Sequence, residues 1–135
     1  MTGAVAQGLL DTSIFIALES GRPITAGLLP DYGLISPVTI AELQAGVLAA
    51  AALDLRARRL ATLESTADIE VLAIDAAVAA EWARLRVHLA QAGRRVNVDD
   101  LWIAATAAAH GIPVVTQDAD FTPLLGATGV DVILL

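Results

Sequence analysis

The stretch LLDTSIFI, residues 9–16, ends a short apolar run on Asp11 and follows that acid with two hydroxyl side chains, Thr12 and Ser13. The residues GLL before Asp11 are typical of a short buried strand. The apolar pattern resumes at Ile14 and runs to a glycine and a proline at 21 and 23, which predicts a helix that begins at Thr12. An acid between a strand and a helix is usually a cap, so Asp11 by itself does not identify a functional site.

The same alternation of strand and helix continues outward from this stretch. Further strands are predicted at 32–36, 112–116 and 130–135, and residues 69–74 are a strand or an extended connection. Helices are predicted after Ser36-Pro37, around 53–63, from Asp75 to Gly93 and from Asp99 to Gly111, with a short helix within 118–125. Asp54 and Asp75 are predicted to be helix caps. The pattern indicates an α/β fold with a mainly parallel sheet of four to five strands between helices on both faces.

The composition limits the function classes. The chain has 135 residues, one domain by default, with no cysteine and no lysine, and its fifteen acids exceed its eight arginines to give a net charge of −7. Such an acidic chain is a poor nonspecific nucleic-acid binder, although its acids could hold cations. No apolar run is long enough to span a bilayer and no signal peptide is evident, so we expect a cytoplasmic protein without membrane contact.

Four acids from four predicted segments could meet at one edge of the sheet. Asp11 and Asp118 follow strands, while Glu42 and Asp100 lie near the beginnings of helices. If the strands are central and parallel, the carboxyl ends form the ligand-binding edge. Two carboxylates about 4 Å apart repel by about 4 kcal/mol at an effective dielectric constant of 20, so such a cluster needs protons or cations. Oxygen ligands without His or Cys favour one or two Mg²⁺ or Mn²⁺ ions, the usual apparatus for attack on a phosphodiester.

Two other classes with acids at strand ends do not fit. A phospho-accepting receiver domain needs a lysine near its last strands, and this chain has none. A haloacid-dehalogenase-type phosphatase needs Asp-x-Asp after the first strand, where this chain has Asp11-Thr12-Ser13.

The chain resembles the PIN domain, and most closely the VapC-type toxins of bacterial toxin–antitoxin pairs. The similarity rests on LLDTSIFI (9–16), ISPVTIAELQAG (35–46) and VNVDDLWIAATAAAHGIPVVTQDADF (96–121), in this order and spacing. It covers nearly the whole chain, which implies a single PIN domain over residues 1–135 and a three-layer α/β/α sandwich. In this register Asp11, Glu42, Asp100 and Asp118 match the family's four acids.

The resemblance implies a Mg²⁺- or Mn²⁺-dependent endoribonuclease that cleaves selected cellular RNA, such as tRNA or rRNA, and so inhibits translation. It further implies inhibition by a VapB-type antitoxin, a homodimer, and operator DNA contacted only through the antitoxin. The four acids would ligate or position the metal. The residues expected to support these ligands without binding the metal directly are Ser13, Thr116, Asp99 and Asp120. The candidate RNA contacts are Arg94 and Arg95.

Two alternatives remain open on the sequence. One is a PIN-domain nuclease of RNA processing outside toxin–antitoxin systems, and the other is a PIN fold that binds without catalysis. For Arg94 and Arg95, a solvated helix end is as good an explanation as RNA binding, because cations are favoured near helix C-termini.

Overall fold

A computed structural model describes residues 4–135 and shows a five-stranded sheet between two layers of helices. In chain order the elements are β1 (Gln7–Leu10), α1 (Thr12–Ser20), η1 (Ala26–Leu28), β2 (Tyr32–Ile35), α2 (Pro37–Ala49), α3 (Leu53–Glu64), β3 (Glu70–Val71), α4 (Ala76–Gln91), α5 (Val98–His110), β4 (Val114–Thr116), η2 (Ala119–Leu124) and β5 (Val132–Leu134). The strands follow the order β3-β2-β1-β4-β5, and every pairing is parallel. The predicted α/β/α sandwich with a parallel sheet is therefore confirmed.

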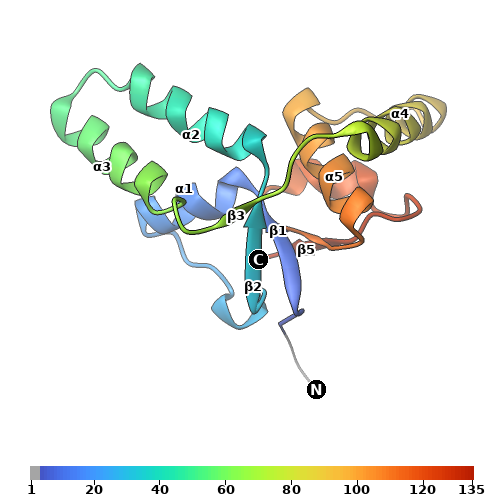
Figure 1. Ribbon diagram of the computed structural model, residues 1–135, viewed down its shortest axis with the longest axis horizontal. Coiled ribbons are helices and arrows are strands. Elements are labelled where there is room, and N and C mark those ends of the chain that lie inside the picture. Colours follow the sequence, from blue (N-terminus) through green and yellow to red (C-terminus); the bar gives the residue numbers. More distant parts are fainter. Residues whose placement is uncertain (1–3) are drawn as a thin grey trace.

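Neighbouring residues of the central strands point to opposite helix layers. Leu9 and Leu34 belong to the larger core cluster, which includes residues of α4, α5 and η2. Leu10 and Ile35 belong to the smaller one, with Phe15 of α1 and Leu43 of α2. Figure 1 shows the two layers, with α1, α2 and α3 on one side of the sheet and α4 and α5 on the other. Successive side chains of a strand point to opposite faces of the sheet, so each central strand contributes apolar side chains to both helix layers.

The helix ends agree with the sequence reading except at the beginnings of α3 and α5. The helix expected from Asp99 begins at Val98, because Asn97 is its N-cap and accepts a hydrogen bond from the Asp99 amide at 2.8 Å. Asp75 caps α4 by accepting a hydrogen bond from the Val78 amide at 3.1 Å. Asp54 was expected to be a cap as well, and this is wrong: Ala52 holds the N-cap position of α3 and makes no side-chain cap bond. Asp54 instead lies in the first turn, where its charge still faces the positive end of the helix dipole.

None of the helices in residues 4–135 is both long enough and apolar enough to cross a bilayer.

Candidate active site

The site lies where the strand order of the sheet reverses. From β1 the chain moves to β2 on one side, and it returns much later to place β4 on the other side of β1. In parallel sheets the crevice outside the carboxyl ends of such a strand pair is the usual ligand site. Asp11 follows β1 and Thr116 ends β4, so residues 105 positions apart in the sequence meet at this point.

Asp11 is held firmly at the bottom of the site. It is the N-cap of α1, is only 3% exposed, and accepts a hydrogen bond from the Ser13 amide at 3.3 Å. The Thr116 hydroxyl donates to the same carboxylate oxygen at 2.8 Å. Asp11 is therefore both the cap that its sequence position suggests and a buried acid of the cleft.

Thr116 connects three parts of the site. Its single hydroxyl proton goes to Asp11, so the Ser13 hydroxyl, 3.0 Å away, must be the donor in the Ser13–Thr116 bond. Thr116 Oγ1 also accepts the Asp118 amide at 2.8 Å, and Ser13 Oγ accepts the Gln117 amide at 2.9 Å. The predicted supporting roles of Ser13 and Thr116 thus have a geometric basis, because both hydroxyls tie the β4–η2 loop to the first helix.

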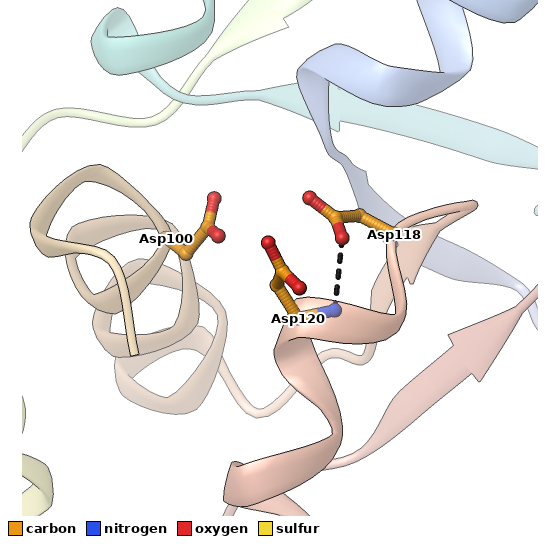
Figure 2. A group of neighbouring side chains, drawn as sticks. All are labelled: Asp100, Asp118 and Asp120. Carbon is orange, nitrogen blue, oxygen red and sulfur yellow. Dashed lines mark hydrogen bonds between the residues drawn. The ribbon is translucent and has the colours of Figure 1, made fainter. Parts of the chain in front are cut away.

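Three carboxylates form a tight group at the mouth of the site. Asp100, Asp118 and Asp120 each offer an oxygen, and these oxygens lie within 4.8 Å of one another (Figure 2). Asp100 comes from the first turn of α5, and Asp118 is the N-cap of η2, where it accepts the Asp120 amide at 2.8 Å. This turn brings Asp120, expected only as an outer group, to the same place as the two predicted ligands.

The electrostatics of Asp100 show that the negative charges of the site are not compensated by the protein. Its pKa is raised from 3.8 to about 7, first by burial and then by Asp11, Asp118, Glu42 and Asp120. Among residues 4–135, the ion pair within 4.0 Å joins Arg84 to Glu81 and includes none of these acids. A proton or an external cation must therefore balance part of the charge.

Glu42 lies beside this group on α2. The Thr12 hydroxyl donates to Glu42 Oε1 at 2.6 Å, and Thr12 Oγ1 is 3.2 Å from the fully buried Thr39 Oγ1. Burial is the main cause that raises the pKa of Glu42; the Thr12 bond opposes it, and Asp99 and Asp11 add to it. Asp99 thus acts on Glu42 from an exposed position, and is not in the tight group.

The candidate RNA contacts lie next to the acids. Arg94 and Arg95 are exposed in the loop between α4 and α5, and Arg94 Nη1 donates to the Pro123 carbonyl at 3.3 Å. Arg95 lines an open groove of about 440 Å³ together with Asp120. Arg95 and an acid of the cluster therefore face one solvent-filled space.

Sequence reasoning missed Thr12 and Thr39 at the site and Arg86 farther along α4. Thr12 and Thr39 have no distinguishing mark in the sequence beyond a hydroxyl in the first turns of α1 and α2, and only the packing of α1 against α2 makes Glu42 their neighbour. Arg86 lies in the middle of α4 and looks like an ordinary exposed helix residue. The sequence could have indicated Arg86 by its i,i+4 spacing from Trp82, because residues so spaced lie on the same helix face. The Arg86 guanidinium does lie over the Trp82 ring.

The donor set fits a divalent cation. Every group that converges is a carboxylate or hydroxyl, cysteine is absent, and the two histidines are at 88 and 110, outside the group of three acids. Hard oxygen ligands of this kind suit Mg²⁺ or Mn²⁺ better than Zn²⁺.

Comparison with known proteins adds a family. The PIN domain profile matches residues 8–124. Ribonuclease VapC5 of Mycobacterium tuberculosis is 57% identical over 133 residues, which cover 98% of each chain. Ribonuclease VapC4 of the same species is 44% identical over 123 residues, covering 89% of this chain and 92% of that relative. A crystal structure of VapBC-5, a member of the VapBC family of toxin-antitoxin systems from M. tuberculosis, matches with a TM-score of 0.91 at 55% identity and covers 96% of this chain and 99% of that chain.

Proposed function

The chain belongs to the PIN-domain family and, within it, to the VapC ribonucleases, and from this membership we propose that it is the endoribonuclease toxin of a VapBC pair. The observation that carries the proposal is the group of Asp100, Asp118 and Asp120 at the strand-order reversal, with Asp11 and Glu42 close enough to raise the pKa of Asp100. Residues 1–135 form one PIN domain in this proposal.

The four family acids Asp11, Glu42, Asp100 and Asp118 would hold one or two Mg²⁺ or Mn²⁺ ions, with Asp120 as an additional ligand. Such ions, when bound, activate a water nucleophile and neutralise charge on the scissile phosphate. The chain supplies the positioning. Asp11 is fixed by the Thr116 hydroxyl and Glu42 by the Thr12 hydroxyl, so neither carboxylate must reorganise when RNA arrives.

Asp100 would bind the ion as a carboxylate, so ion binding must displace its proton at pH values below about 7. Asp99 lies on the side of Glu42 and tunes that acid. Arg94 and Arg95 contact RNA phosphates beside the acids. Without these arginines, the net charge of −7 would repel the phosphates.

The partners follow from the relatives. VapBC-5 is a member of the VapBC family of toxin-antitoxin systems. By analogy, we propose that the present chain is bound and inhibited by a VapB-type antitoxin. The proposal includes a homodimer in the cytoplasm, operator DNA contacted only through the antitoxin, and selected cellular RNA such as tRNA or rRNA as the substrate.

The proposal is tested by incubating purified protein with total cellular RNA in the presence of Mn²⁺ and in the presence of EDTA. We expect discrete fragments that require the metal and disappear with Asp100→Asn. The matched control is Asp54→Asn, which removes an exposed acid from α3 and should leave cleavage unchanged.

Absence of fragments with metal-loaded wild-type protein would favour a PIN fold that binds without catalysis. Fragments that persist in EDTA or with Asp100→Asn would show a contaminating nuclease and remove the support for the assigned acids. Mapping the cut ends by sequencing would separate a toxin that cleaves a translation RNA from a processing nuclease.

A further inference from the structure

A groove on the α4–α5 side of the molecule gathers three of the eight arginines. It has a volume of about 560 Å³ and is lined by Arg86, Arg94 and Arg95 and by the apolar Leu89, Val96 and Leu101, among others. Within the described part of the chain none of these arginines lies within ion-pair distance of a carboxylate. In a protein of net charge −7, this arginine groove is a local concentration of unpaired positive charge.

The groove leads to the acid cluster. A second groove of about 440 Å³ shares Arg95 and Val96 with the arginine groove and reaches Asp120. Leu101 also lines the arginine groove, and it directly follows Asp100 in α5. A strand that lies in the arginine groove would therefore enter the candidate active site at its next phosphates.

Arg86 is held in place at the far end of the groove. Its guanidinium carbon lies 5.3 Å from the centroid of the Trp82 ring, and Trp82 stacks on Trp102 with 5.0 Å between centroids and 22° between planes. A guanidinium ordered over an indole loses less side-chain freedom when it binds an anion than a free side chain would. Arg86 is thus prepared for a phosphate several residues away from the acids.

We infer that the arginine groove binds the phosphates of an unpaired RNA segment that flanks the cleaved bond, with Arg86 as its outer contact. The inference rests on the proposed ribonuclease function and extends it to the part of the substrate outside the reacting phosphate. The chemistry of the lining favours an unpaired strand. Arginines match phosphates, and the exposed Ala90 and the partly exposed Val96 offer an apolar surface to the faces of unstacked bases, which a duplex keeps inside.

The test measures binding of a fluorescein-labelled oligouridine by anisotropy over a range of salt concentrations. The protein carries Asp100→Asn so that the RNA is not cut. Each lost phosphate contact should lower the slope of log K against log salt by about 0.7 for a single strand. We expect a loss of this size for Arg86→Gln and about twice this size for Arg94→Gln with Arg95→Gln, whereas Arg56→Gln, an exposed arginine on α3, should behave like the parent.

One further variant and one further probe keep the result interpretable. Arg86→Lys retains the charge, so it should keep the slope even if the stack on Trp82 is weakened. Oligouridine annealed to oligoadenine should bind less tightly than the single strand and be insensitive to Arg86→Gln. Equal affinity and slope in parent and groove variants, equal effects on duplex and single strand, or no binding by the parent would each overturn the inference.

Cleavage of total RNA by the same groove substitutions, made in protein that retains Asp100, separates this inference from the proposed function. If wild-type protein cleaves and the groove variants cleave with unchanged kcat/KM, the groove inference is wrong and the ribonuclease stands. If wild-type protein does not cleave with Mn²⁺, the function itself is wrong. A higher KM with little change in kcat for Arg86→Gln would support a binding contact remote from the reaction.

Discussion

Thr12 gives its hydroxyl proton to Glu42, an acid whose charged form is disfavoured by burial. The hydrogen bond is short, at 2.6 Å, and Thr12 is itself buried and neighboured by Thr39. Loss of a hydrogen bond to a charged group in such surroundings typically costs 1–3 kcal/mol. Thr12 is therefore a positioning residue for an acid of the proposed metal site.

We expect Thr12→Val to lower the rate of RNA cleavage about tenfold, because the supporting partners of metal ligands contribute 10–100-fold to activity or metal affinity. The free energy of unfolding should fall by about 1–2 kcal/mol. Thr12→Ser keeps the hydroxyl and should restore most of both quantities. Cleavage assays, urea denaturation and calorimetric titration with Mn²⁺ measure the three effects.

A matched control for Thr12 exists on the same helix layer. The Thr62 hydroxyl donates to Glu19 Oε1 at 2.7 Å, which is again a threonine–glutamate pair. Glu19 is neither in the group of three acids nor among the acids that raise the pKa of Asp100. Thr62→Val should change stability but neither cleavage nor Mn²⁺ binding. If both threonine variants affect cleavage equally, the role of Thr12 is structural and the positioning argument is wrong.

The positions of the four matched acids could be predicted from the sequence because each follows a recognisable strand end or helix beginning. Asp120 could be predicted only as an outer group, since its entry into the tight group depends on the turn in which its own amide bonds to Asp118. The acceptor of Thr12 could not be predicted, because it depends on how α1 and α2 pack.

β1 is the central strand of the sheet, and its one glycine, Gly8, packs closely against Val115 and Pro30. A Cβ atom built on Gly8 would lie 2.8 Å from Val115 Cγ2 and 3.2 Å from Pro30 Cγ. Val115 is completely buried and its χ1 angle is stiff, so the contact cannot be relieved by a flexible side chain. The glycine lets β1 approach β4, which carries Thr116 to Asp11.

We therefore expect Gly8→Ala to lower the free energy of unfolding by about 1–3 kcal/mol through overpacking. Gly27→Ala is the control, because a Cβ atom there meets nothing within 4 Å and the residue does not have a positive φ angle. Its effect should stay within about 0.5 kcal/mol. Urea denaturation of the two variants measures the difference, and equal stability would contradict the close approach of β1 to β4.

Element types were predictable because apolar periodicity distinguishes the buried strands from the helices. Strand lengths were less predictable. Of the strand predicted at 69–74, only Glu70–Val71 pair in the sheet. Of the strand predicted at 130–135, only Val132–Leu134 do so. Both are edge strands, where the partner strand and not the apolar run determines how far the pairing extends. The predicted Asp54 cap is wrong because α3 begins at Leu53, two residues before the first helical position that a cap at 54 would give.

Concentrated negative charge makes the stability of the whole molecule depend on pH and on cations. The folded-state pKa of Asp100, about 7, lies above its ordinary value of 3.8, so folding favours the protonated form. Its contribution to stability is complete below pH 4 and is lost as the pH rises through 7. The raised pKa of Glu42 acts in the same direction.

Without metal, the free energy of unfolding should fall between pH 5 and pH 8 by about 2 kcal/mol from Asp100, a value reduced for the screening of a half-buried group. Mn²⁺ should restore stability at pH 8 more than at pH 5, because ions bind the carboxylate form. Asp100→Asn should flatten the pH dependence, while Asp54→Asn should not. Melting temperatures across this range provide the measurement, and identical slopes for both variants would contradict the uncompensated cluster.

The sheet order and layers of the whole molecule could be predicted in outline, since alternating strands and helices require a parallel sheet between two helix layers. The arginine groove could not, because Arg86 and Arg95 come together only through the fold of the α4–α5 connection.

The strand-order reversal also fixes when the protein can become active during its synthesis. Asp100, Asp118 and Asp120 all lie in the last part of the chain, and β4 must insert beside β1 before Thr116 can reach Asp11. Contacts between such distant segments form late in folding, and a chain emerges from the ribosome beginning with its N-terminus. A growing chain therefore cannot assemble the acid cluster until residues 100–120 have left the ribosome and β4 has paired with β1. The ribosome that makes it is not exposed to its activity before that point.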